Sequence, residues 1–125
     1  MQNVAKEKAT KFTDLVAWQK GHGLVVAVYE ATSSFPPEEK FSLTNQIRRS
    51  VVSITSNLAE GFGRQSRGDK GHFYTIARGS ILELQNQLII ARDIKILDKD
   101  EFNKLTEKSI IVHKLVNGLI KSLSK

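Results

Sequence analysis

The feature that most constrains the fold is a run of apolar residues, spaced three and four apart, between positions 43 and 62. At 100° per residue this spacing puts the whole set on one side of a helix: Leu43, Ile47, Val51, Ile54, Leu58 and Phe62. The opposite side carries Arg, Ser, Asn, Gln and a single Glu, and it has no lysine. Such side chains favour directed hydrogen bonds over simple hydration. We therefore expect a helix that packs with one side and contacts a partner with the other.

Three further segments show the same periodicity. The first is expected from about residue 13 to 32, with a seam of Leu15, Trp18, His22, Val25, Tyr29 and Thr32. The next carries Phe73, Ala77, Ser80, Leu84, Leu88 and Ala91 on one side. The last carries Phe102, Leu105, Ser109, Val112, Val116, Leu119 and Leu123. Each seam predicts a helix with one buried side.

Prolines, glycines and capping residues set the expected helix ends. Pro36 and Pro37 end the first helix. The second helix begins either directly after Pro37 or after a short turn, with Ser42 as its cap, and left-handed glycine at 61–63 is expected to end it. Capping-box spacing at 66–69 and 98–101 opens the third and fourth helices.

These elements predict an all-α fold, an antiparallel up-down-up-down four-helix bundle over residues 12–125, preceded by a flexible tail, residues 1–11. Two observations leave alternatives open. Gly21 and Gly23, inside the first helix, indicate either close approach by a neighbouring helix or a kink. Ile111, Leu115 and Ile120 widen the apolar arc of the last helix, which indicates either a broad core or a subunit interface.

The central motif carries a family resemblance. The string QIRRSVVSITSNLAEGFGR, with FPPEEKFSLTN before it and GSILEL after it, resembles the four-helix-bundle family of 23S rRNA intervening-sequence proteins. The similarity extends upstream to FTDLVAWQKGHGLVVAVYEAT and covers most of residues 12–123. It implies a homopentameric ring with a basic surface. It also implies kinship with the accessory variability proteins of diversity-generating retroelements, which work with a reverse transcriptase and its RNA.

Composition narrows the function classes. The 125 residues contain no cysteine, which excludes disulfides, thiolate metal sites and cysteine nucleophiles. Isolated histidines at 22, 72 and 113 form no ligand pair, so we expect no metal, and no cofactor motif is present. No apolar stretch approaches the roughly 18 residues that span a bilayer, so no membrane partner and a cytoplasmic location are expected.

Charge points to a polyanionic partner. The net charge is +6, and residues 41–80 hold six basic and two acidic side chains. We expect these six to contact the phosphates of RNA or DNA: Arg48, Arg49, Arg64, Arg67, Lys70 and Arg78. The basic connection around residues 61–71 is either part of this site or an ordinary solvated turn. Most of the aromatic side chains are expected in the core, and Tyr74, off the main apolar series and next to the basic segment, is the one candidate for stacking on bases.

A second polar group is expected to be structural, namely Ser53, Asn57, Glu60, Ser80 and Glu83. The same two carboxylates would suit acid–base catalysis if they were buried, but we expect them in ion pairs and expect no enzymatic activity. His22 is expected in the core or at an interface. The sequence thus predicts a non-enzymatic, homo-oligomeric RNA-binding protein. The alternative is a scaffold whose arginines bind a reverse transcriptase or another acidic protein without touching nucleic acid.

Overall fold

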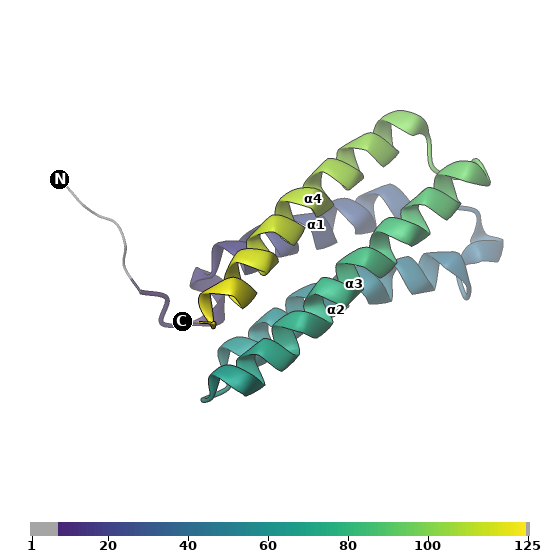
Figure 1. The fold of residues 1–125 in the computed structure, drawn as a ribbon. Helices are drawn as coiled ribbons and strands as arrows, with labels where there is room; N and C mark the ends of the chain where they lie inside the picture. The colour runs from purple at the N-terminus through teal and green to yellow at the C-terminus, as the bar shows by residue number, and fades with distance from the viewer. Residues whose placement is uncertain (1–7, 125) are drawn as a thin grey trace.

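The computed structural model describes residues 8–124, and four long α-helices account for most of them (Figure 1). In chain order the elements are the 3-10 turn η1 (Phe12–Asp14), α1 (Val16–Thr32), the 3-10 turn η2 (Pro37–Glu39), α2 (Leu43–Phe62), α3 (Arg67–Asp93) and α4 (Lys99–Ser122). This part of the chain contains no strand, which confirms the all-α class. The first seven residues of the expected tail 1–11 lie outside the described residues.

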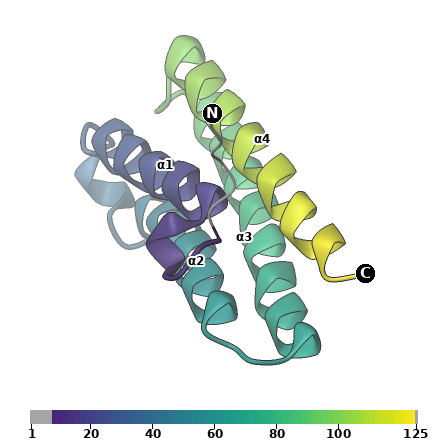
Figure 2. The ribbon, with the colours of Figure 1, turned by 90° about the vertical axis from the view of Figure 1, so that its left-hand side faces the viewer.

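The helices form a bundle in which each helix packs against two others. Contacts join α1 to α2, α2 to α3, α3 to α4, and α4 back to α1 (Figures 1 and 2). Along each of three helix pairs, residue numbers rise on one helix as they fall on the other. Between α1 and α2, the contacts are Thr32 with Arg48 and Gly21 with Thr55. Between α2 and α3 they are Ser53 with Ser80 and Gly61 with Tyr74, and between α3 and α4 they are Gln85 with Ser109 and Arg78 with Asn117. The start of α1, the α2–α3 connection and the end of α4 therefore lie at one end of the bundle.

The core is aliphatic and continuous along the bundle. Its fully buried side chains come from all four helices: Leu24, Val28, Ile47, Val51, Ile54, Leu58, Ile81, Leu84, Leu88, Leu105, Val112 and Val116. Burial of this set removes apolar surface from water and is the main force that holds the helices together. The predicted seams of α2 and α4 are confirmed except at their ends, where Phe62, Phe102, Leu119 and Leu123 are only partly buried.

The predicted seam of α1 is wrong by one position, except at Thr32, which is buried as predicted. The buried residues are Ala17, Gly21, Leu24, Val28 and Thr32, whereas Trp18 and Val25 are partly buried and Tyr29 is 41% exposed. The error has a physical cause, because α1 carries apolar residues on several sides and its true seam includes two small residues. A pattern that favours large side chains selects the neighbouring stripe. His22 is exposed and stacks on Trp18 with ring centroids 4.9 Å apart, so it is not a core residue.

The helix ends follow most of the expected signals. Of the two alternatives for α2, the structure has the short turn followed by a new start after Ser42, although the Ser42 hydroxyl donates to Glu39 (2.7 Å) instead of capping the helix. Ser66 and Asp98 accept the predicted capping bonds from the backbone N–H groups of Asp69 (3.0 Å) and Glu101 (2.8 Å). The expected left-handed glycine is wrong, since Gly63 has a φ of −77°.

Two glycines allow α2 to approach its neighbours closely. A Cβ on Gly21 would lie 3.1 Å from the Thr55 methyl group, so close approach explains this residue. A Cβ on Gly61 would lie only 2.7 Å from the ring of Tyr74. Gly23 is different, because it is exposed and nothing lies within 4 Å of the position that its Cβ would take. Close approach therefore does not explain Gly23.

Alanine at two glycines should shift stability in opposite directions. Gly23→Ala should raise the free energy of unfolding by about 0.5–1 kcal/mol, because it adds helix propensity without a clash. Gly61→Ala should lower it by about 1–2 kcal/mol, because the new methyl group must displace the buried Tyr74 ring. Urea denaturation at one fixed protein concentration measures both. Equal shifts in the same direction would contradict the contact between Gly61 and Tyr74.

Candidate nucleic-acid interface

The excess positive charge is concentrated in one half of the bundle. We call this the terminus half, and it comprises residues 8–22, 55–78 and 112–124, which the helix contacts bring together. Its nine basic side chains are Lys8, Lys11, Lys20, Arg64, Arg67, Lys70, Arg78, Lys114 and Lys121, and its three acids are Asp14, Glu60 and Asp69. The rest of the described chain, residues 23–54 and 79–111, holds eight basic and nine acidic side chains. A polyanion is therefore attracted mainly to the terminus half.

The structure divides the six predicted phosphate-binding residues between the two halves. Arg64, Arg67, Lys70 and Arg78 belong to the terminus half, on the end of α2 and the first turns of α3. Arg48 and Arg49 lie on the first half of α2, where acidic and basic charges nearly balance. The six residues do not form a single patch.

Three of the six cations are bonded to neutral oxygens of neighbouring elements. Arg48 donates to the Thr32 hydroxyl (2.9 Å) and to the Tyr29 carbonyl (3.3 Å), and its guanidinium lies 4.5 Å from the Tyr29 ring centroid. Lys70 donates to the carbonyl of Phe62 (2.7 Å) at the end of α2, and Arg78 donates to the side-chain oxygen of Asn117 on α4 (3.1 Å). These cations link helices, yet no carboxylate cancels their charge in these contacts.

The remaining cations are exposed. Arg64 forms an ion pair with Glu60 one turn earlier (2.5 Å), and its guanidinium lies 4.6 Å from the Phe73 ring centroid. Both partners are exposed, so the pair contributes little to stability and an incoming phosphate can compete for Arg64. Within residues 8–124 no hydrogen bond or ion pair is formed by the side chains of Arg49 and Arg67. These two are free to bind an external anion.

Three of the five residues of the predicted polar network are hydrogen-bonded to one another. The hydroxyls of Ser53 and Ser80 bond each other across the α2–α3 contact (2.8 Å), and the Asn57 amide donates to the Ser53 hydroxyl (3.0 Å) and carbonyl (2.8 Å). Glu60 forms an ion pair, as expected of it, and its partner is Arg64. Glu83 is exposed on α3 and lines a polar groove beside Arg49. Neither carboxylate is buried, so neither has the environment that acid–base catalysis requires.

Tyr74, the candidate for stacking on bases, is buried in the fold. Tyr74 is 3% exposed and its ring packs against Gly61, so no base can reach it. Burial desolvates the phenolate and raises the pKa of Tyr74 above its usual value. Phe73, the neighbour that was assigned to the seam, is the less buried of the two. The buried position at the start of α3 is thus one residue later than predicted, whereas along α1 the buried positions are one residue earlier.

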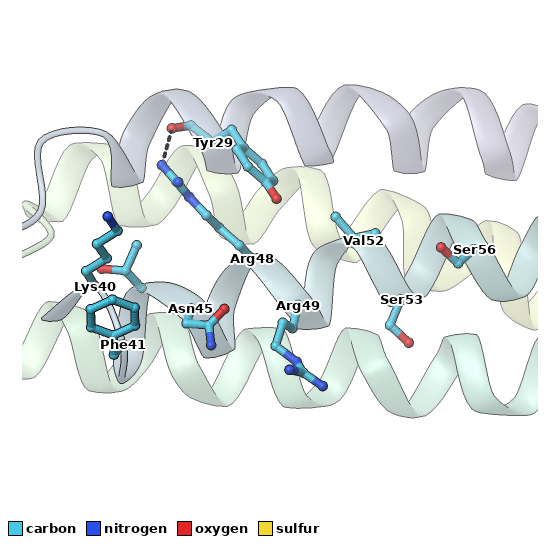
Figure 3. Close-up of a pocket in the computed structure, with 10 residues that line it drawn as sticks. Tyr29, Lys40, Phe41, Asn45, Arg48, Arg49, Val52, Ser53 and Ser56 are labelled. Atoms are coloured by element: carbon cyan, nitrogen blue, oxygen red, sulfur yellow. Dashed lines mark hydrogen bonds between the residues drawn. The ribbon is translucent and has the colours of Figure 1, made fainter.

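An aromatic groove at the start of α2 was missed by the sequence analysis. It has a volume of 610 Å³, and among its ten lining residues are Tyr29, Lys40, Phe41, Asn45, Arg48 and Arg49 (Figure 3). Phe41 is 87% exposed. It lies in the turn before α2, outside every periodic series, so a helical pattern gives no weight to it. The one available signal in the sequence was a phenylalanine flanked by Lys40 and by Ser42, the predicted helix cap.

Other site classes receive no support from the described residues. No group of three His, Asp or Glu side chains in residues 8–124 is arranged to hold a metal ion. None of the helices in this range has the length and apolar character that crossing a bilayer requires.

Together, the fold and the charge distribution define a class: an all-α four-helix protein with a strongly basic end. Residues 13–118 match the family described as 23S rRNA-intervening sequence protein. This chain belongs to that family. A crystal structure of a protein of unknown function from the S23 ribosomal protein family of Bacteroides thetaiotaomicron is similar, with a TM-score of 0.80 and 25% identity over 87% of this chain and 98% of that chain. No curated protein matches the chain.

The paired hydroxyls of Ser53 and Ser80 should be energetically coupled. Ser53→Ala or Ser80→Ala alone should lower the free energy of unfolding by about 1 kcal/mol, because each leaves a hydroxyl without its partner in the helix contact. The double variant should lose about 1 kcal/mol less than the sum of the two. Denaturation of the four proteins, with Ser122→Ala as an exposed control, measures the coupling. Strict additivity would show that the two hydroxyls do not interact.

Proposed function

We propose that this protein is a non-enzymatic, RNA-binding homo-oligomer that holds phosphates against the terminus half. The observation that carries the proposal is the segregation of charge, with nine basic and three acidic side chains in that half. Membership in the 23S rRNA-intervening sequence protein family favours RNA over DNA as the partner. In this proposal the chain acts as an accessory of an rRNA insertion or of a retroelement.

The charge pattern suits phosphate binding without sequence readout. Exposed Arg67 and Lys121 can each contact a phosphate, and Arg64 can exchange its carboxylate partner for one. Lys70 and Arg78 add positive potential although their hydrogen bonds are used within the fold. Binding of this kind releases counterions and weakens steeply as salt rises.

Assembly would multiply these contacts. We propose that the antiparallel up-down-up-down bundle associates into a ring of five, because α4 keeps apolar side chains exposed outside the core. Ile110 and Ile111 are 42% and 49% exposed, beyond the buried seam of the same helix. A ring presents each weak phosphate site five times in one particle, so that avidity exceeds the affinity of a single site.

Charge reversal in the terminus half should weaken RNA binding more than the same change elsewhere. Arg67→Glu with Lys121→Glu should lower the affinity for a structured RNA and reduce the slope of log K against log salt by about 1 for each lost contact. The matched control is Lys99→Glu with Lys104→Glu, which makes the same charge change at exposed positions of the other half. Titrations across ionic strength measure both. If both double variants lost the same affinity for RNA, the loss would be explained by net charge alone and not by the terminus half.

The proposed pentamer should be detectable from the molar mass of the particle in solution. Light scattering coupled to size exclusion should give about five times the 14.0 kDa of one chain. Ile111→Asp should shift the particle toward monomer, because a charge cannot be buried cheaply in an apolar contact. The control is Leu82→Asp on α3, where a side chain of similar exposure (52%) on another helix is replaced. If the wild-type protein were a monomer at micromolar concentration, the proposed ring would be contradicted.

The rival proposal is a scaffold that binds an acidic protein through the same cations. Recovery of a protein partner after nuclease treatment, together with no affinity of the purified chain for RNA at low salt, would favour the scaffold and contradict direct phosphate contact.

A further inference from the structure

We infer that the aromatic groove at the start of α2 binds an unpaired nucleotide, with its base against Phe41 and its phosphate on Arg49. This inference rests on the proposed RNA-binding function and adds a second kind of contact to it. The terminus half attracts phosphates of any nucleic acid, whereas this groove selects single-stranded segments.

The exposed aromatic surface is the first support. Phe41 is 87% exposed and Tyr29 is 41% exposed, and both line the same groove. Leaving a phenyl ring in water is unfavourable, and a stacked base covers it from one side. Bases inside a duplex are already stacked and cannot reach such a ring, so the partner must be unpaired.

The charges around the rings are the second support. The ten lining residues include Lys40, Arg48 and Arg49 and no acid. The Lys40 ammonium lies 5.5 Å from the Phe41 ring centroid, so a cation already accompanies the ring. A groove that combines cations with aromatic faces matches a phosphate joined to a base, and it repels cationic segments.

The order of side chains along α2 is the third support. Figure 3 shows Phe41 in the turn before α2, followed by Asn45 and Arg49 along the helix, so a ring, an amide and a guanidinium follow one another. Arg48 points toward the Tyr29 carbonyl and is held there, whereas Arg49 points the other way and forms no hydrogen bond within the described residues. The groove volume of 610 Å³ is in the range of about 300–1,000 Å³ that small-molecule sites occupy, so one nucleotide fits.

The test compares single-stranded with paired RNA. An unstructured oligouridylate of about ten nucleotides and a duplex of the same length are titrated with the wild-type protein and with Phe41→Ala. The variant should bind the oligouridylate about tenfold more weakly, because a stack is lost, and the duplex within about twofold of the wild type. Phe41→Trp should keep the single-strand affinity, since indole stacks at least as well.

The controls separate this inference from the function on which it rests. Leu82→Ala removes exposed apolar surface away from the groove and should leave both affinities unchanged. If charge reversal at Arg67 and Lys121 weakens binding but Phe41→Ala does not, the groove inference falls and the phosphate surface stands. If the wild-type protein binds neither RNA at low salt, both fall.

Two other results would also overturn the groove assignment. A change in particle mass for Phe41→Ala, with RNA affinity intact, would make Phe41 part of a subunit contact. Competition by polyglutamate as strong as that by oligouridylate of equal charge would show that the groove takes acidic protein segments.

Discussion

The tight contact between α2 and α3 is the constraint on which the rest of the molecule depends. It is the most extensive helix pairing in the described bundle, and small residues make it possible. Gly61 receives the Tyr74 ring near one end, and the hydroxyls of Ser53 and Ser80 meet near the middle. Because side chains this small leave no room for adjustment, the rotation of α2 about its axis is fixed. That rotation in turn places Arg49 beside α3 and Arg48 beside α1.

The way in which the cations are satisfied decides how much charge the surface keeps. Arg48, Lys70 and Arg78 each donate to neutral hydroxyl, carbonyl or amide oxygens. A neutral acceptor satisfies the hydrogen-bonding need of a partly buried cation without cancelling its positive charge. A structural role and an electrostatic role are therefore compatible in the same side chain. Among the acids of residues 8–124, only Glu60 forms an ion pair with one of the six predicted cations, Arg64.

Periodicity predicted most buried positions of α2, α3 and α4, because a regular apolar series at steps of three and four runs along each of them. It failed on α1, where small Ala17 and Gly21 line the true seam and large Trp18 and Tyr29 attract the pattern away from it. A one-residue error of the same kind assigned Phe73 to the buried seam of α3, where Tyr74 is the buried residue. The candidate site was less predictable for another reason. Lys121 and Arg67 are far apart in sequence, and the folded arrangement of the helices brings their basic segments to the same end, where Gly71 meets Leu123.

The two candidate surfaces act over different distances, and this difference gives each a distinct role under the proposed function. The excess charge of the terminus half produces a field that extends about 8 Å at physiological ionic strength, so it captures any polyanion. Around Phe41 the acidic and basic charges of the other half nearly balance, and long-range attraction is weak there. Discrimination at the groove must then come from contact with Phe41, Asn45 and Arg49. A strand held by its phosphates at one end of the bundle can be sampled by the groove for unpaired bases, which makes capture general and retention selective.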